Sequence, residues 1–168
     1  MLKNLIELTK VRIGFLVLTT TIIGFYLGAQ GKIDNMLLLF TVIGTLLSST
    51  GSSVMNNVIE SESDKLMDRT KNRVLPTKKI SLNFAKFLGI SFIIVGLLIL
   101  YFKVNFLTCM LSLLTIILYL FLYTPLKRKS WLNTSVGAIP GAIPPLGGWT
   151  AATNSLEWGG IAVFLILF

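Results

Sequence analysis

Residues 56–76 read NNVIESESDKLMDRTKNRVLP and follow directly on a long apolar run. Four of the seven acidic residues of the chain fall within nine positions of this stretch: Glu60, Glu62, Asp64 and Asp68. Three cations follow at once: Arg69, Lys71 and Arg73. Carboxylates beside a membrane helix are costly unless other charges compensate them. A divalent metal ion and an anionic substrate would provide that compensation here.

The apolar surroundings of this stretch reflect the whole chain, which is 54% hydrophobic and 13% charged. Soluble domains carry about 25% charged residues. The composition therefore predicts an integral membrane protein of the all-α class, a polytopic bundle of transmembrane helices. There is no histidine, which removes the commonest zinc and haem ligand and the usual general base. Cys109, the single cysteine, lies in an apolar run and is expected to be a buried hydrophobic side chain.

A helix needs about 20 mostly apolar residues to cross a bilayer. Five segments meet this requirement, and a sixth begins without reaching the needed length: 13–30, 36–58, 84–102, 104–123, 131–152 and the incomplete 158–168. We expect a single domain over 1–168 that forms the N-terminal part of a larger, C-terminally truncated bundle. The alternative is a short natural protein that ends in a half-helix.

The basic residues show a strong asymmetry if the five helices alternate across the membrane. Thirteen of the fifteen fall on one side, in the N-terminal dozen and in the loops 60–86 and 124–131. The positive-inside rule then predicts that these segments are cytoplasmic, most simply at a bacterial cell membrane. The net charge of +8 is accordingly a topology signal, and nucleic acid is not an expected partner because the cations lie on membrane loops.

Small residues within the predicted helices favour close helix packing. Gly44 and Gly51 occupy the second span, and Gly137 and Gly141 the fifth. Three prolines also fall in the fifth span, and we expect them to kink or break that helix beside a cavity: Pro140, Pro144 and Pro145.

The spacing within residues 56–76 carries the chemical hypothesis. Asn56, Glu60, Asp64 and Asp68 recur every four positions, which places them on one face of a helix. Carboxylates so arranged repel one another, and a purely structural helix gains nothing from this. Mg²⁺ takes one or two carboxylates together with phosphate oxygens, so the spacing predicts a metal–diphosphate site. The alternative interpretation is a solvated helix end at the membrane surface.

The cations would bind the same anion. Arg69, Lys71 and Arg73 are suited to hold a diphosphate and stabilise it as a leaving group, although they also set the topology. A second stretch on the same predicted side adds candidates from residues 123–133: Tyr123, Lys127, Arg128 and Asn133. The alternative for this stretch is an interfacial belt, with Tyr123 and Trp131 at headgroup level.

Taken together, these stretches resemble the intramembrane prenyltransferases of the UbiA superfamily, and within it the protohaem IX farnesyltransferase (haem O synthase) family. The resemblance rests on three blocks: TKVRI at 9–13, NNVIESESD with MDRTKNRVL at 56–75, and YTPLKR with GAIPP and GW at 123–149. Two positions depart from the family pattern. Glu60 stands where aspartate is usual, and Ser61 stands where arginine is usual, which would weaken a phosphate contact.

The resemblance implies farnesyl transfer from farnesyl diphosphate to a vinyl group of protohaem IX, giving haem O, with haem as substrate and Mg²⁺ as cofactor. It implies catalytic roles for Asn56, Glu60, Asp64 and Lys127, and a bundle of about nine helices. Association with other haem-synthesis or oxidase-assembly membrane proteins is also expected. Two alternatives stay open: a related prenyltransferase that acts on a quinone precursor, and a non-enzymatic membrane protein that binds cations or lipids.

Overall fold

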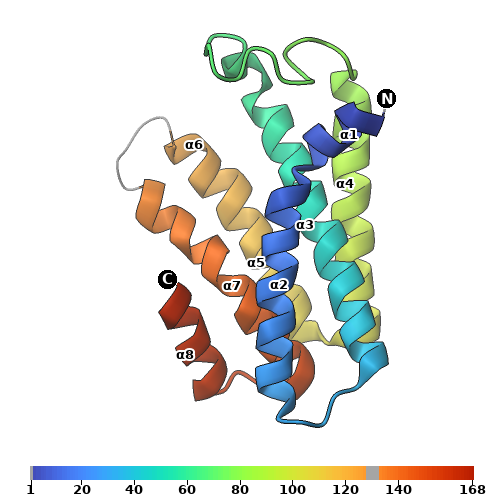
Figure 1. Cartoon of the computed structure of the whole chain (residues 1–168), viewed down its shortest axis with the longest axis vertical. Coiled ribbons are helices and arrows are strands. Elements are labelled where there is room, and N and C mark those ends of the chain that lie inside the picture. The colour runs from blue at the N-terminus through green and yellow to red at the C-terminus, as the bar shows by residue number, and fades with distance from the viewer. Residues whose placement is uncertain (1, 128–132) are drawn as a thin grey trace.

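The computed structural model describes residues 2–127 and 133–168, and this part of the chain is helical without any strand. The helices follow in the order α1 (Leu2–Thr9), α2 (Val11–Ala29), α3 (Asn35–Asp64), α4 (Leu82–Ile99), η1 (Leu100–Val104), α5 (Phe106–Ile117), η2 (Leu118–Tyr123), α6 (Thr124–Leu126), α7 (Asn133–Thr153) and α8 (Trp158–Leu167) (Figure 1). The two η segments are π-helical continuations of α4 and α5. The prediction of an all-α bundle is confirmed.

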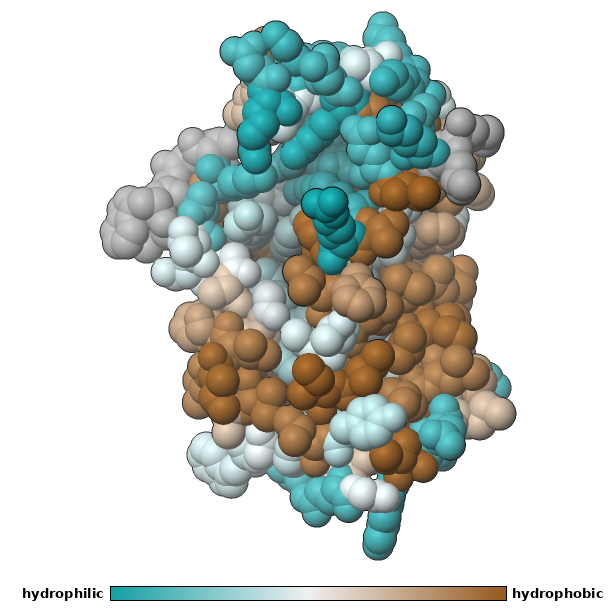
Figure 2. All heavy atoms as spheres, viewed as in Figure 1, coloured by the Kyte–Doolittle hydropathy of each residue, from teal (hydrophilic) through white to brown (hydrophobic). Residues whose placement is uncertain are grey.

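Four helices of the described part are long and apolar enough to cross a membrane: Val11–Ala29, Asn35–Asp64, Leu82–Val104 and Phe106–Leu126. They correspond to the first four predicted spans. The fifth predicted span is α7, which has 21 residues but a lower apolar content because of its glycines and prolines. On the face that Figure 2 shows, apolar side chains cover the middle of the molecule and hydrophilic side chains gather mainly at the end that carries α1 and the loop after α3.

Local capping determines where the long helices begin. The Asp34 carboxylate accepts hydrogen bonds from the backbone N–H groups of Met36 and Leu37, at 2.9 and 3.0 Å. Ser81 caps α4 and Asn105 caps α5 in the same way. Each cap satisfies backbone donors that the first helical turn leaves without partners.

Helix α3 is longer than its predicted span, which ended at residue 58. It continues to Asp64, so the acidic stretch is helical as far as that residue. Figure 1 shows that this end of α3 lies at the same end of the bundle as α1 and α6.

Glycines allow the helices to pack backbone against backbone. A Cβ added at Gly24 of α2 would overlap the Pro145 carbonyl of α7, and one added at Gly148 would overlap the Thr21 carbonyl. Between α3 and α4, a Cβ at Gly51 would come within 2.6 Å of the Gly89 carbonyl oxygen. The close approach expected of the small residues in α3 is thus observed.

The three prolines do not interrupt α7, which is continuous from Asn133 to Thr153. The break that we allowed for is therefore not observed, whereas a kink stays a prediction. Each proline removes one backbone hydrogen bond, but the surrounding residues keep theirs. The tight packing of α7 on α2, where Pro144 and Pro145 are buried, holds the helix in one piece.

The adjacent glycines Gly147 and Gly148 provide a test of this packing. Gly148→Ala should destabilise the protein by about 1–3 kcal/mol, because its methyl group would overlap backbone of α2. Gly147→Ala should change stability by less than about 1 kcal/mol, since the space beside Gly147 is open. Thermal unfolding of both variants in detergent measures the difference, and equal effects would contradict the backbone contact.

Candidate active site

A cavity of about 1130 Å³ extends between α2, α3, α5 and α7. Its polar end is bordered by Lys10, Asn56, Asp64, Arg73 and Lys127. Its interior is lined by apolar and hydroxyl side chains, among them Val17, Thr21, Ser48, Leu100, Thr108, Leu111, Ser112 and Ile116. The cavity therefore combines a charged mouth with a mostly uncharged interior. Pockets for a drug-sized ligand measure about 300–1,000 Å³, so this cavity is large enough for a long isoprenoid chain.

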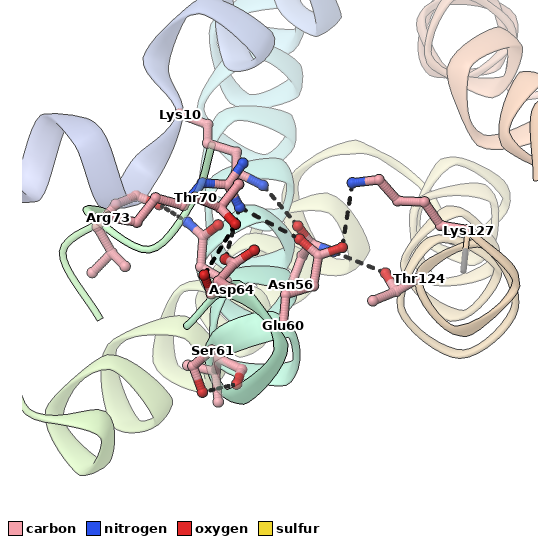
Figure 3. Close-up of polar contacts among 12 residues, drawn as sticks. Lys10, Asn56, Glu60, Ser61, Asp64, Thr70, Arg73, Thr124 and Lys127 are labelled. Carbon is pink, nitrogen blue, oxygen red and sulfur yellow. Dashed lines mark hydrogen bonds and ion pairs between the residues drawn. The ribbon is translucent and has the colours of Figure 1, made fainter. Parts of the chain in front are cut away.

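Helix α3 places three oxygen-bearing side chains on one face at the mouth, as the four-residue spacing predicts. Asn56, Glu60 and Asp64 are 2%, 3% and 4% exposed, respectively (Figure 3). Carboxylates so deeply buried require compensating cations or hydrogen-bond donors. Ser61 directly follows Glu60 in the chain, but its side chain points away from this group and donates a hydrogen bond to the Val58 carbonyl.

Three cations from separate segments meet these side chains. Arg73 Nη1 lies 2.8 Å from Asp64 Oδ2 and 3.7 Å from Glu60 Oε2. Lys127 Nζ lies 3.4 Å from Glu60 Oε1. Lys10 Nζ donates to Asn56 Oδ1 at 2.7 Å. The mouth thus joins the start of α2, the end of α3, the loop after α3 and the end of α6 (Figure 3).

A smaller pocket of about 150 Å³ opens directly on the carboxylates. Its wall includes Glu60, Asp64, Arg69, Arg73 and Lys127. The described lining residues of the two pockets together include five cations and three carboxylates. The excess of positive charge favours an anionic ligand.

Asn56 has both ends of its amide in use. Its Oδ1 accepts from Lys10, while its Nδ2 donates to Thr124 Oγ1 at 2.9 Å. Thr124 in turn donates to the Tyr119 carbonyl at 2.8 Å. These bonds tie α3 to the end of the π-helical segment η2.

Lys10 is a site residue that the sequence alone did not reveal, since its charge counted there only toward topology. It lies between α1 and α2 with a positive φ of 50°, which turns its side chain toward α3. Burial lowers the pKa of Lys10 to about 8, although the Glu60 carboxylate opposes this. The signal that points to it is its place in the TKVRI block.

Most of the predicted site residues that the structure describes line one of the two pockets, but Asp68 and Lys71 do not. Arg69, Tyr123 and Asn133 line the cavity with the residues above. Asp68 lies beyond the end of α3, and its side chain is 98% exposed and paired with Lys71 at 2.7 Å. Their mutual pairing in solvent separates both from the buried group. Arg128 and Trp131 fall outside the described residues.

The oxygen donors fit Mg²⁺ in a particular way. No group of three or more acidic, histidine or cysteine side chains suited to a metal occurs within 2–127 and 133–168. The two carboxylates and the Asn56 amide oxygen nevertheless match the preference of Mg²⁺ for one or two carboxylates, completed by phosphate oxygens and water. The donor set suits a metal that binds together with a diphosphate rather than in an all-protein cage.

Residues 17–168 match the model of the UbiA prenyltransferase family. The chain belongs to this family. Among its relatives are proteins named protoheme IX farnesyltransferase from Solibacter usitatus and Aquifex aeolicus, each 40% identical over 99% of this chain. One from Leptospira biflexa is 41% identical over 96%. The chain spans 60%, 58% and 57% of these three UbiA-family relatives, in that order.

Two solved structures share the UbiA fold. One is described as a digeranylgeranylglyceryl phosphate synthase in membranes, with a TM-score of 0.86 and 22% identity over 99% of this chain and 58% of its own. The other is a UbiA homologue from Archaeoglobus fulgidus bound to DMAPP and Mg²⁺, with a TM-score of 0.75 and 19% identity over 98% of this chain and 58% of its own. Because both sequence identities are below 25%, the likeness to these two structures establishes the fold of this chain and nothing further.

Lys127 lines the cavity, whereas Lys71 lies at the surface, so substitutions of these two lysines can be compared. Lys127→Met should weaken the binding of inorganic diphosphate about 10- to 100-fold, because it removes a charged donor from the mouth. Lys71→Met should change binding by less than about twofold, since Lys71 pairs with Asp68 in solvent. Titration of inorganic diphosphate into the protein in lipid nanodiscs measures both, and a large effect of Lys71→Met would contradict its placement outside the binding site.

Proposed function

We propose that the protein is a protohaem IX farnesyltransferase, which transfers the farnesyl group of farnesyl diphosphate to a vinyl group of protohaem IX and forms haem O. The observation that carries this proposal is the buried Glu60–Asp64 pair, surrounded by cations at the mouth of a cavity of about 1130 Å³. This arrangement suits a diphosphate at the mouth and an isoprenoid chain inside. The names of the relatives support the choice of haem as acceptor.

Asn56, Glu60 and Asp64 would hold Mg²⁺ at the mouth. When bound, the ion supplies positive charge that lowers the cost of releasing the diphosphate. Arg69, Arg73 and Lys127 bind the diphosphate oxygens, with Tyr123 and Asn133 on the adjoining wall. Arg128 retains its predicted role as a further diphosphate ligand.

The reaction begins with heterolysis of the C1–O bond of farnesyl diphosphate, and the bonding electron pair leaves with the diphosphate. The cations at the mouth stabilise that developing negative charge. The vinyl group of the acceptor then forms a bond to C1, which moves the positive charge onto the former vinyl carbon beside the porphyrin. Water adds there and a proton is released, giving the hydroxyethylfarnesyl group. The interior of the cavity shields the first cation from premature hydrolysis.

The two departures from the family pattern bear differently on this proposal. Glu60 keeps a carboxylate within reach of Arg73 and Lys127 despite its extra methylene group. Ser61 is buried on another side of α3 and lines neither pocket. Its effect on diphosphate contact at the mouth is therefore expected to be small.

We propose that the protein lies in the bacterial cell membrane, with its N-terminus and the loops 60–86 and 124–131 in the cytoplasm. The charge asymmetry of the chain supports this orientation. With this orientation the mouth of the cavity opens toward the cytoplasm. Association with other haem-synthesis or oxidase-assembly proteins stays a prediction.

Incubation of membranes containing the complete gene product with farnesyl diphosphate, protohaem IX and Mg²⁺ tests the proposal directly. We expect haem O, detected by its mass and by its longer retention in reversed-phase chromatography. Parallel incubation with an aromatic acid as quinone precursor tests the alternative acceptor. Prenylation of the aromatic acid without haem O would contradict the proposed acceptor, and no prenylation of either would contradict the enzyme assignment.

Glu60 and Glu62 form a matched pair for the metal hypothesis. Glu60→Gln should lower haem O formation by about 100-fold or more, because it removes a buried charge that faces the ion and the diphosphate. Glu62→Gln should leave the rate within about twofold, since Glu62 is exposed and pairs with Lys65 at the surface. Rates over a range of Mg²⁺ concentrations check both, and unchanged Mg²⁺ dependence in Glu60→Gln would remove Glu60 from the metal site.

A further inference from the structure

Two tyrosines of the segment η2, Tyr119 and Tyr123, line the cavity below its charged mouth. Their rings stack with centroids 5.7 Å apart and an interplanar angle of 14°. Both residues are partly buried, unlike a side chain of an interfacial belt at headgroup level. Tyr101 provides the contrast, because it is 49% exposed and lines neither pocket.

The backbone that carries this pair is fixed to the site. In the π-helical turn the N–H of Thr124 donates to the Tyr119 carbonyl, which also accepts from Thr124 Oγ1 at 2.8 Å. Thr124 Oγ1 accepts in turn from Asn56 Nδ2. Short π-helical turns within helices are frequent at functional sites, where they change the direction of side chains.

The position of the stack along the cavity follows from these bonds. Tyr123 is next to Thr124 in the chain and thus lies near the depth of Asn56, and Tyr119 stacks on it. A diphosphate bound at Glu60, Asp64 and Arg73 would leave the first carbons of its isoprenoid chain at this depth.

Gly137 of α7 holds the stack from the other side. A Cβ at this position would come within 2.7 Å of Tyr123 Cε2, so the ring of Tyr123 lies directly against the α7 backbone. Tyr123 is thereby held between α7 and Tyr119. Tyr119 itself is partly buried and lines the cavity.

We propose that Tyr119, backed by Tyr123, is a catalytic residue whose ring stabilises the allylic cation formed when the C1–O bond breaks. The proposal rests on prenyl transfer as the proposed function and adds a residue to its mechanism. The negative face of an aromatic ring attracts a nearby cation, and most strongly where water is excluded. The cations at the mouth stabilise the departing diphosphate, so the two halves of the broken bond meet opposite charges in the same cavity.

Fluorination of the ring tests this role without changing its shape. Replacing Tyr119 by phenylalanine and then by mono-, di- and trifluorophenylalanine weakens the negative face stepwise. The rate of ionisation should fall stepwise, by about 3- to 30-fold over the series, while the affinity for farnesyl diphosphate stays constant. The same series at Tyr101, also in a π-helical segment, should leave the rate unchanged.

Ionisation is measured in the complete gene product in two ways. Haem O formation reports the full reaction. Scrambling of an oxygen-18 label from the bridging to the non-bridging positions of farnesyl diphosphate, without acceptor, reports reversible C1–O cleavage alone. The second measurement does not depend on the identity of the acceptor, so it separates this proposal from the haem assignment.

The outcomes are distinct. A stepwise fall in label scrambling at Tyr119 supports the proposal, whether haem or another compound is the acceptor. Equal rates along the series, with normal haem O formation, would overturn the role of Tyr119 and leave the proposed function standing. A loss of farnesyl diphosphate binding instead of rate would show a binding role and overturn the proposal. Absence of scrambling and of product in the unmodified protein would overturn both.

Discussion

Burial of two neighbouring carboxylates, Glu60 and Asp64, is the constraint on which the rest of the site depends. Each is less than 5% exposed, and neither is stable there as an anion without cations in contact. The cations come from Arg73 in the loop after α3 and Lys127 at the end of α6. Lys10 joins through Asn56. Assembly of the mouth and compensation of these charges are therefore the same event, and segments far apart in sequence converge because of it.

The cations that compensate the carboxylates are the same ones that we propose to bind the diphosphate, and the two roles are compatible. A metal ion on the carboxylates would take over their compensation, and the arginine and lysine side chains would then be available to phosphate oxygens. The π-helical turn that carries Thr124 links this electrostatic centre to the aromatic wall of the cavity. Charge at the mouth and aromatic surface below it thus form one connected arrangement, on a fold that the UbiA family shares.

Much of this arrangement could be predicted from the sequence. Hydropathy and charge asymmetry predict a helical membrane bundle, and the spacing by four places Asn56, Glu60 and Asp64 on one face because α3 extends through all of them. The spacing does not place Asp68 on the same face, because the helix ends at Asp64. Beyond it the chain turns, and Thr70 Oγ1 donates a hydrogen bond to the Asp64 carbonyl. The contact of Lys10 with Asn56 depends on an unusual backbone angle and joins residues 46 positions apart, so the TKVRI block marks the residue without specifying its partner. The continuity of α7 depends likewise on tertiary packing.

The glycine contacts between α2 and α7 also restrict where the cavity can become wider. Where Gly24 and Gly148 meet the opposite backbone, no side chain can rotate to create space. Backbone atoms therefore set the separation of α2 and α7 at this contact. Any change in the width of the cavity must then come from walls lined by side chains that can rotate, such as Leu111 and Ile116 on α5. Backbone contacts thus fix the spacing of α2 and α7, and rotation of lining side chains remains as the means of adjusting the cavity.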